Sequence, residues 1–341
     1  MTATLQVSRN TLDGTQIEFA LERMLIGVAP AMRQLRSLIR RVSRTSLPVL
    51  IEGPTGSGKE LVAQAIHIAS GRPGRLVAFN VAAVGETLFE DALFGHVKGA
   101  FTGATASIPG HLVEAHRGTC FLDEIGALPQ GLQPKLLRAI ESGNFRPLGA
   151  RSDSSSDFRV VAATNEPVSR LVRLGRFRED LAFRLSGVVI AVPPLGDRIE
   201  DVPILANHFA QSMACEHTQA VTFSAGAMLA LQERDWPGNV RELKHTVERV
   251  MALADGPVIT AADVRARSSA RSSHTVDVTG DERRRTQLRD VLTSVDWDTA
   301  KAATVLGVDR TTVYRRMNRL GVSTPARRAA SSVKGGDAQG V

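Results

Sequence analysis

The residue types best suited to chemistry form a glycine-rich turn between a predicted strand and a predicted helix. The turn reads Gly53-Pro54-Thr55-Gly56-Ser57-Gly58-Lys59. Its glycines allow successive backbone N–H groups to converge on phosphate oxygens, and the following helix adds the positive end of its dipole. Lys59 supplies a cation for the β- and γ-phosphates. The pattern predicts a phosphate-binding loop (P-loop) for a nucleoside triphosphate.

The residue after this turn departs from the common P-loop pattern. Glu60 stands where a Ser or Thr hydroxyl usually binds Mg²⁺. If ATP binds here with Mg²⁺, the metal must be held in another way. We expect Asp123, together with water, to hold it.

Two later apolar runs end in polar residues that suit phosphoryl transfer. The run 120–122 is followed by Asp123 and Glu124, and the run 162–164 is followed by Asn165. A carboxylate near Mg²⁺ and a second one that polarises the attacking water are the acids that this reaction uses. Asn165 is a candidate sensor of the γ-phosphate, although taken alone it is also an ordinary turn residue.

Arginines complete the candidate chemistry. Phosphoryl transfer spreads negative charge over the transferred group, and a planar guanidinium compensates that charge well. The candidates are Arg178, Arg184 and Arg241. By sequence alone, each of them suits a surface ion pair as well.

These side chains need a scaffold that brings the ends of several strands together. Short apolar runs, which predict strands, occupy residues 48–51, 77–79, 120–122, 160–163 and 188–190. Helical patterns lie between them, for example over residues 32–42, 60–68 and 133–141. Strands that alternate with helices predict an α/β fold with a parallel sheet covered by helices on both faces.

Beyond Pro194 the pattern becomes helical, with apolar periodicity over residues 202–213, 225–232 and 240–253. A Ser-rich stretch poor in large apolar residues then predicts a linker. The predicted order is a short lead-in (1–22), an α/β subdomain (23–192), an all-α subdomain (193–265), a flexible linker (266–283), a small all-α domain (284–324) and a disordered basic tail (325–341).

Composition excludes several classes of protein. A chain of 341 residues that is 43% hydrophobic and 23% charged can bury the cores of two or three domains. No apolar run approaches the roughly eighteen residues of a membrane span, and the N-terminus lacks a signal-peptide pattern. Two cysteines are too few for a disulfide framework, and the eight histidines lack metal-ligand spacing. We therefore expect a cytoplasmic protein without a membrane partner or a zinc site.

The net charge of +7 is concentrated near the C-terminus. Residues 266–341 hold 14 Lys and Arg against 8 Asp and Glu, so the rest of the chain is nearly neutral. A basic end on a neutral body is typical of nucleic-acid binding, although a solvated basic tail produces the same excess.

A helix-turn-helix pattern within the basic end favours DNA binding. Apolar residues suited to its packed faces are Ala302, Ala303, Leu306, Val313, Met317 and Leu320. Polar residues expected on the outside of its second helix are Arg310, Thr311, Thr312, Arg315, Arg316 and Arg319. We expect this helix, residues 310–320, to lie in the major groove of double-stranded DNA, with most of its arginines on phosphates.

Residues of about 23–265 resemble the central AAA+ domain of NtrC-type bacterial enhancer-binding proteins, which activate sigma-54 RNA polymerase, and the basic end resembles a Fis-type helix-turn-helix. The segments that carry the resemblance are the P-loop with its Glu60, Leu93–His96, Gly99–Ala104, Phe121–Gly126, Phe177–Leu185 and Trp236–Leu243. The P-loop of this family normally ends in Lys-Glu, so Glu60 favours membership. The Gly99–Ala104 hexapeptide is the most specific signal, because other AAA+ classes lack it.

The resemblance implies roles for individual residues. The hexapeptide Gly99-Ala100-Phe101-Thr102-Gly103-Ala104 would form the tip of a mobile loop that contacts sigma-54. Asn80 would link Glu124 to the nucleotide state, and Arg241 would be the second sensor in the all-α subdomain, which serves as a lid. Arg184, with Arg178 beside it, would be the arginine finger that reaches the γ-phosphate in a neighbouring subunit. A finger in trans implies a homo-oligomer, with DNA-bound dimers assembling into a hexameric ring.

The implied function is that of an ATP-hydrolysing transcriptional activator. It would bind upstream DNA and convert closed promoter complexes of the sigma-54 RNA polymerase holoenzyme into open ones. One alternative is a DNA-binding regulator that acts on the other polymerase, with ATP only controlling its oligomerisation. Another is a AAA+ remodeller of DNA-bound protein. The hexapeptide disfavours both.

Three departures from the family pattern carry consequences. Residues Pro194–Arg198 lack the first arginine of the usual Pro-Leu-Arg-Glu-Arg, which places a contact between the sheet and the lid in doubt. Val81 replaces the usual Cys, a change of packing. Only about 22 residues precede the ATPase, where the family often has a regulatory domain, and so few cannot fold alone. We therefore expect control by abundance or by a separate regulatory protein acting in trans, without an attached receiver domain.

Overall fold

The computed structural model describes residues 14–214, 222–254, 256–268, 278–306, 310–320 and 322. The chain divides into two compact units, residues 1–264 and residues 265–341. Within the described ranges, no helix is both long and apolar enough to cross a membrane.

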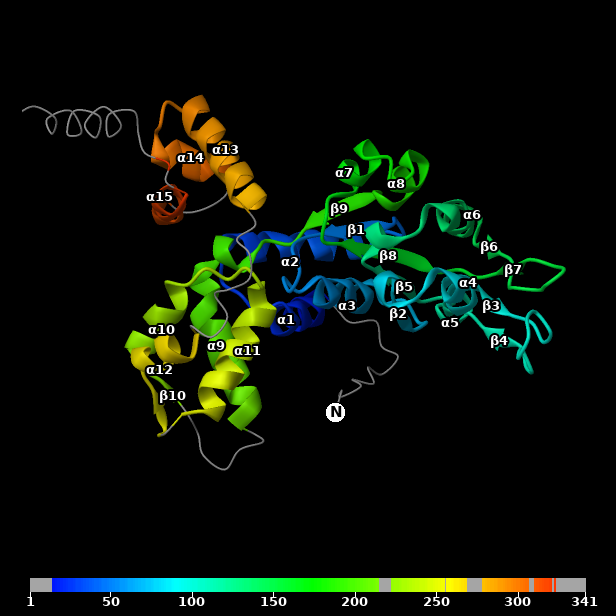
Figure 1. The fold of residues 1–341 in the computed structure, drawn as a ribbon, viewed down its shortest axis with the longest axis horizontal. Helices are drawn as coiled ribbons and strands as arrows, with labels where there is room; N and C mark the ends of the chain where they lie inside the picture. The colour runs from blue at the N-terminus through cyan, green and yellow to red at the C-terminus, as the bar shows by residue number, and fades with distance from the viewer. Residues whose placement is uncertain are drawn as a thin grey trace, which may run out of the picture. The chain divides into compact units, whose positions relative to one another are not determined.

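A five-stranded parallel sheet, in the order β2-β5-β8-β1-β9, forms the centre of the first unit (Figure 1). Its strands are β1 (Val49–Glu52), β2 (Leu76–Asn80), β5 (Thr119–Asp123), β8 (Arg159–Thr164) and β9 (Val188–Ala191). Each predicted apolar run is thus a strand of this sheet. Because the strands are parallel, their carboxyl ends meet at one edge, where the polar residues that follow them gather.

Two separate cores cover the two faces of the sheet. In β1, Val49 and Ile51 pack on one face and Leu50 on the other, as the period of two along a strand requires. The helices on the first face are α1 (Gly14–Met24), α2 (Pro30–Ser43) and α3 (Lys59–Ser70). Those on the second are α4 (Glu86–Phe94), α5 (His111–Glu114), α6 (Gln133–Ser142), α7 (Val168–Arg173) and α8 (Glu179–Leu185). The predicted α/β fold is confirmed.

Helix α1 lies where we expected only a weakly patterned lead-in. Leu21 and Leu25 are buried in the core that α2 and α3 share, and Ile17 packs against it. The spacing of these three residues, i, i+4 and i+8, is that of one helical face, which explains why the segment folds onto the sheet. Residues 1–13 lie outside the described part of the chain.

Two short antiparallel pairs extend from the same end of the α/β part (Figure 1). One joins β3 (Gly95–His96) to β4 (Ile108–Pro109), and the other joins β6 (Asn144–Phe145) to β7 (Ser154–Ser155). A bridge between His96 and Leu148 holds the two pairs together at their base. The hexapeptide is therefore part of the connection between β3 and β4.

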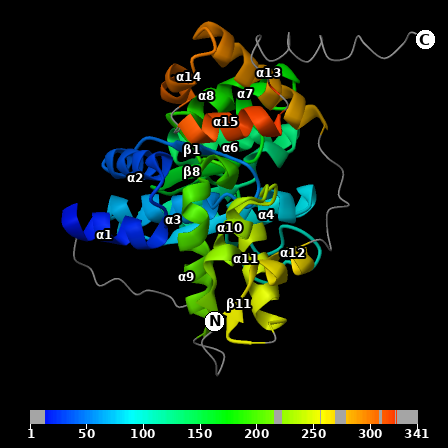
Figure 2. The same ribbon diagram turned by 90° about the vertical axis from the view of Figure 1, so that its left-hand side faces the viewer.

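The lid follows the sheet and has its own core. Figure 2 shows α9 (Val202–Ala214), α10 (Ala225–Gln232), α11 (Asn239–Ala252) and α12 (Ala261–Ser268) grouped together. These helices include the three that were predicted. The lid also contains a two-residue parallel pair, β10 (Thr222–Phe223) with β11 (Val258–Ile259), which a purely helical prediction omits. The described residues of the first unit also form the 3₁₀ turns η1 (Val81–Ala83), η2 (Ile125–Ala127), η3 (Gln130–Leu132), η4 (Leu195–Asp197) and η5 (Ile199–Asp201).

The second unit contains α13 (Val278–Ser294), α14 (Thr299–Leu306) and α15 (Arg310–Arg319). The apolar residues predicted for its packed faces form its core, with Leu288 and Leu292 added by α13. The turn at 307–309 and the tail at 325–341 lie outside the described residues.

The linker predicted at 266–283 is helical at both of its described ends. Residues 266–268 belong to α12 and residues 278–283 to α13, and the residues between them lie outside the described part. Scarcity of large apolar residues does not prevent a helix, because Arg and Glu have good intrinsic helix propensity.

Candidate nucleotide site

The P-loop connects the end of β1 to the start of α3 and depends on its glycines. Gly56 and Gly58 have φ angles of +76° and +103°, in the left-handed region that favours glycine. A Cβ on Gly56 would lie 2.3 Å from the carbonyl oxygen of Gly238 in the lid. The loop therefore needs glycine here both for its own bend and for close approach of the lid.

Lys59, the first residue of α3, is almost fully buried beneath the P-loop. Its Nζ donates a hydrogen bond to the carbonyl oxygen of Gly53 at 3.0 Å and lies 3.9 Å from Oε1 of Glu124. A buried ammonium group requires such partners, because an unpaired charge is costly to remove from water. Strand, loop and helix thus bring the cation and an acid from distant parts of the sequence together.

The two acids follow the central strand β5. Asp123 is its last residue, and its Oδ1 accepts a hydrogen bond of 3.0 Å from the N–H of Glu124. Glu124 itself has a φ of +53°, unusual for a residue with a side chain. Asn80 stands opposite Asp123 in the neighbouring strand, and its Oδ1 accepts from the N–H groups of Ala82 and Ala83 at 2.9 and 3.2 Å.

A cavity of about 900 Å³ joins these elements to the lid, a size suited to a nucleotide. Of the residues predicted for the site, those that line it are Thr55, Gly56, Ser57, Gly58, Lys59, Glu60, Asn80, Asp123, Glu124 and Arg241. Apolar side chains, among them Met24, Ile26 and Phe209, line it as well. The cavity therefore combines surfaces suited to phosphates with surfaces suited to a flat base. Gly53 and Pro54 lead into it from β1.

The donor set fits Mg²⁺ that arrives with a nucleotide. Among the described residues, no group of three or more His, Cys, Asp or Glu side chains could hold a metal by itself. Mg²⁺ typically takes one or two carboxylates and completes its shell with water and phosphate oxygens. Asp123 at the end of β5 suits that role.

Asn165 lies outside this cavity. It is exposed and lines a second hollow, of about 710 Å³. Arg176, which we did not predict from the sequence, lines the same hollow. Glu124 and Thr55 border both spaces. The structure thus brings Asn165 close to Glu124, but not among the residues that line the larger cavity.

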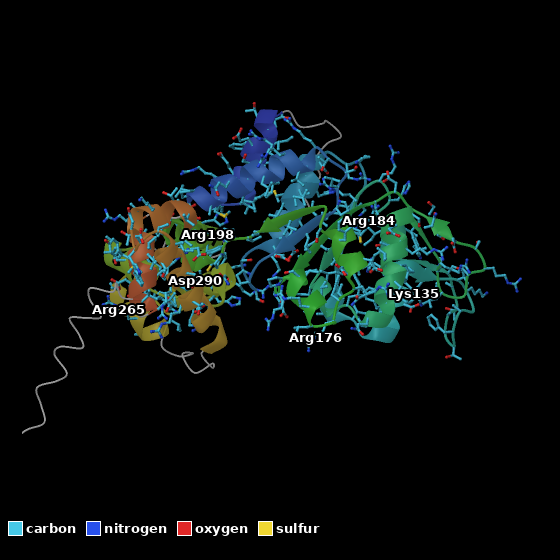
Figure 3. The ribbon with its side chains drawn as sticks, turned by 90° about the horizontal axis from the view of Figure 1, so that it is seen from above. Lys135, Arg176, Arg184, Arg198, Arg265 and Asp290 are labelled. Atoms are coloured by element: carbon cyan, nitrogen blue, oxygen red, sulfur yellow. The ribbon has the colours of Figure 1, made fainter. Side chains whose placement is uncertain are left out.

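The two candidate finger arginines line neither space. Arg178 and Arg184 are both exposed, on the segment that contains α8 (Figure 3 labels Arg184). Arg178 donates to both carboxylate oxygens of Asp180, at 3.0 and 2.7 Å, and this pairing holds the pKa of that carboxyl below its usual value. Nη2 of Arg184 lies 3.4 Å from the carbonyl oxygen of Ile140. Neither guanidinium is part of the lining of the nucleotide cavity in its own chain.

Residues near Gly196, which stands in place of the first arginine of the family pattern, make contacts between the sheet and the lid. Nη2 of Arg198 donates to the carbonyl oxygen of Ser57 at 3.1 Å, and burial lowers the pKa of the Arg198 guanidinium. Oδ1 of Asp201 accepts from the N–H groups of Val28 and Ala29 at 2.6 and 2.9 Å. Arg198 is labelled in Figure 3. Asp201 could not be identified from the sequence, since a lone Asp in a polar turn carries no special pattern.

The hexapeptide forms a tight turn with one exposed aromatic side chain. Gly99 and Gly103 have φ angles of +81° and +99°, and the N–H of Gly99 donates to the carbonyl oxygen of Ala104 at 2.9 Å. Phe101 remains 48% exposed, with its ring centre 5.0 Å from that of His96, and Thr102 is exposed beside it. The turn therefore presents an apolar and a hydroxyl group to a partner.

The candidate DNA-contacting residues all belong to α15. Arg310 at its start is exposed, and its Nε donates to Oγ1 of Thr299 at 3.0 Å. Arg316 is half-buried. The side chains of Thr311, Thr312, Arg315 and Arg319 lie outside what the structure describes.

Three family models match this chain. They are the sigma-54 interaction domain over residues 25–191, the AAA+ ATPase lid domain over residues 196–280, and the Fis family of bacterial regulatory proteins over residues 285–320.

Full-length relatives agree with these matches. The chain is 40% identical over 319 residues to the Nif-specific regulatory protein of Klebsiella pneumoniae, which covers 90% of the chain and 60% of that relative. It is 40% identical over 306 residues to the transcriptional regulatory protein ZraR of Salmonella typhi, covering 86% of the chain and 68% of the relative. The chain thus spans about 60% of the length of the Nif-specific relative.

Solved structures show the same architecture. NtrX from Brucella abortus in complex with ADP matches with a TM-score of 0.65 and 32% identity, over 90% of this chain and 71% of that one. NtrX in complex with ATP matches equally well, with 33% identity over 87% and 69% of the two chains. The chain therefore belongs to the family of sigma-54-dependent transcriptional activators, in which a AAA+ ATPase domain and its lid precede a Fis-type helix-turn-helix.

Proposed function

We propose that this chain hydrolyses ATP and uses the energy to convert closed complexes of sigma-54 RNA polymerase into open ones, while its second unit is bound to upstream DNA. The observation that carries the proposal is the convergence of the P-loop, both acids, Asn80 and Arg241 on one nucleotide-sized cavity. The ADP and ATP complexes of NtrX support binding of the same nucleotides here.

The chain's own residues supply the catalytic groups. The N–H groups of the P-loop and the ammonium of Lys59 bind the phosphates. Asp123 would hold Mg²⁺, which would supply positive charge next to the phosphate oxygens. The carboxylate of Glu124 accepts a hydrogen bond from the attacking water and orients it. Asn80 stands opposite Asp123 in the sheet and would link the position of Glu124 to the nucleotide state.

The charge that develops in the transition state needs a further cation from outside the chain. Arg184 and Arg178 are exposed and away from their own cavity, so they are available to a neighbouring copy. A finger supplied in this way requires head-to-tail contacts that close into a ring, and we propose a hexamer formed from DNA-bound dimers.

The hexapeptide would transmit the nucleotide state to sigma-54. Glycine at both ends allows the turn to change conformation, and Phe101 exposed between them favours a protein partner. A difference of a few kcal/mol between nucleotide states is enough to shift such a loop from one position to the other.

One binding experiment tests the proposal directly. The purified chain is incubated with sigma-54 and with ATP, ADP or a transition-state analogue of ATP hydrolysis, and complex formation is followed by native gel electrophoresis and sedimentation. We expect a stable complex only with the analogue, because the loop position that binds sigma-54 accompanies hydrolysis. ATP-dependent oligomers that never bind sigma-54 would instead support the reading in which ATP only controls assembly.

A further inference from the structure

The carbonyl groups of the P-loop are fully occupied within the first unit. Each of the six carbonyl oxygens from Gly53 to Gly58 accepts a hydrogen bond of 3.0 to 3.3 Å. Their donors are Nζ of Lys59, the N–H of Ser57, Nδ2 of Asn239, the N–H of Arg241, Nη2 of Arg198 and the N–H of Val62, in that order. The donors for the three central oxygens, those of Thr55, Gly56 and Ser57, belong to the lid.

This pattern fixes which way the central peptides of the loop face. In a trans peptide the C=O and the N–H point in opposite directions. The carbonyls of Thr55 and Ser57, held toward the lid, therefore turn the N–H groups of Gly56 and Gly58 away from it, as phosphate binding requires. The N–H of Ser57 instead donates to the carbonyl oxygen of Pro54 within the loop. If one of these peptides turned over, it would direct a carbonyl dipole at the phosphate instead, which is repulsive.

Asn239 is the side chain best placed to prevent such a reversal. It is 2% exposed and begins α11. Its Nδ2 donates to the carbonyl oxygen of Thr55 at 3.0 Å, while its Oδ1 accepts from the N–H of Leu195 at 2.9 Å. One amide thus connects the P-loop, the entry to the lid and the first turn of α11.

We infer that Asn239 is a positioning residue for the phosphates: it holds the P-loop from the lid side in the form whose N–H groups bind a β-phosphate. The inference rests on the proposed nucleotide site and adds a residue that sets its preference for polyphosphates. Arg198, through the carbonyl of Ser57, supports the same arrangement.

A simpler explanation of Asn239 is its backbone. Its φ is +54°, a conformation that Asn tolerates better than most residues. Asn239→Gly separates the two explanations, because glycine adopts this φ without strain but carries no amide. If only the backbone matters, the glycine variant binds nucleotides as the wild type does.

The experiment compares ADP with AMP. Dissociation constants of both are measured by calorimetry for the wild-type chain and for N239G, with thermal unfolding to show that the variant is folded. We expect N239G to bind ADP roughly tenfold more weakly or worse, the effect of losing the buried hydrogen bond to the carbonyl of Thr55. Its affinity for AMP, which has no β-phosphate, should not change. A general loss of structure would weaken both ligands alike.

Ser224→Ala is the matched control. The Ser224 hydroxyl caps α10 within the lid by accepting from the N–H of Ala227 and does not contact the P-loop. We expect S224A to lower the melting temperature but to keep the wild-type preference for ADP over AMP.

The outcomes separate the inference from the proposed function. If the wild-type chain binds neither ADP nor ATP, the proposed nucleotide site itself is wrong. Binding of ADP by wild type and N239G with the same affinity overturns the role of Asn239 alone, as does an equal loss for ADP and AMP. If N239G does not fold, Arg198→Met, which removes the donor to Ser57, takes its place with the same expectation.

Discussion

Glu124 combines a left-handed backbone conformation with a place in the lining of both hollows of the site. Its positive φ is a conformation that costs free energy for a residue with a side chain, and such strain often marks functional positions. In return, the carboxylate lies 3.9 Å from the ammonium of Lys59 and on the border between the two hollows of the site.

Substitution of Glu124 by Gln tests its role as the group that polarises water. The amide keeps the size of the side chain but is a much weaker proton acceptor. We expect E124Q to bind ATP with near-normal affinity and to hydrolyse it roughly 100-fold more slowly or worse. Calorimetric titration measures the binding, and phosphate release measures turnover. Near-normal turnover would remove Glu124 from the catalytic set.

His67 on α3 predicts a pH dependence of stability. Nδ1 of His67 lies 2.9 Å from Oγ1 of Thr119, and burial, with the nearby Arg72 guanidinium, lowers the pKa of the imidazole. The unfolded chain, with a His pKa of about 6.5, therefore takes up this proton at a higher pH than the folded chain. The contribution of His67 to stability is present above pH of about 6.5 and is lost as the pH falls through that value toward the lower folded pKa.

Comparison of His67→Gln with the wild type isolates this contribution. Urea unfolding at several pH values between about 5 and 8 gives the free energy of unfolding for both chains. We expect the wild type to lose more stability than H67Q on acidification, because Gln does not titrate and can still hydrogen-bond to Thr119. Parallel curves would show that the imidazole does not titrate differently in the folded chain.

At the scale of elements, the site is assembled from the carboxyl ends of neighbouring strands. β2 ends at Asn80 and β5 at Asp123, which stand opposite each other, while β1 runs directly into the P-loop. The hexapeptide is not part of this edge but of the connection between β3 and β4. Its glycines, Gly99 and Gly103, allow it to change conformation without a change in the sheet. Hydrolysis and engagement of sigma-54 should therefore be separable by mutation.

Thr102→Ala tests that separation. The variant loses an exposed hydroxyl and no contact within the nucleotide cavity, since Thr102 is not part of its lining. We expect its ATPase rate to equal that of the wild type, while binding of sigma-54 in the presence of the transition-state analogue is lost. Parallel measurements of phosphate release and complex formation decide. A fall in ATPase activity without sigma-54 present would instead place Thr102 in the hydrolytic machinery.

At the scale of the whole molecule, the two units are stabilised by separate cores. The first unit holds the cores of the sheet and the lid, and the second buries Leu288, Leu292, Val313 and Met317 among its own helices. The proposed ATP hydrolysis and the proposed DNA binding would thus belong to separate folded units. Assembly of several copies would then complete the nucleotide site.

Mixed assemblies test whether Arg184 acts between copies. Arg184→Ala should hydrolyse ATP at least about 1000-fold more slowly, as expected on loss of an arginine finger. An R184A subunit retains its own P-loop and Glu124, whereas an E124Q subunit retains its finger. We expect a mixture of the two inactive variants to recover ATPase activity. In mixed rings, the site of an R184A subunit has its own Glu124 and receives Arg184 from a neighbouring E124Q subunit.

Each variant alone, at the same total concentration, is the control for the mixture, and sedimentation shows that oligomers form. Oligomers of both variants that stay inactive when mixed would mean that Arg184 serves its own chain. Full activity of R184A alone would refute its role as a finger.

Local sequence pattern alone was enough to predict the five strands of the central sheet, the P-loop and the helices α2, α3, α6, α9, α10, α11, α14 and α15. Period-two and helical spacing are properties of short segments, and Gly-rich turns followed by Lys carry their chemistry with them. The sequence also predicted Asp123, Glu124 and Arg241, and the family resemblance added Asn80. The fold brings all four to one cavity. The charge excess and the apolar pattern of the basic end likewise predicted its helix-turn-helix.

Only the tertiary structure revealed how the lid holds the P-loop. Asn239, Arg198 and Asp201 reach partners more than 140 residues away, and no local pattern encodes such pairs. The sequence likewise did not predict Arg176, which the fold places beside Asn165 and Glu124. Local periodicity determines which elements form, whereas the distances between their ends are set by packing of the whole chain. The P-loop could be predicted from the sequence, whereas only the fold shows that Asn239 and Arg198 orient its carbonyl groups.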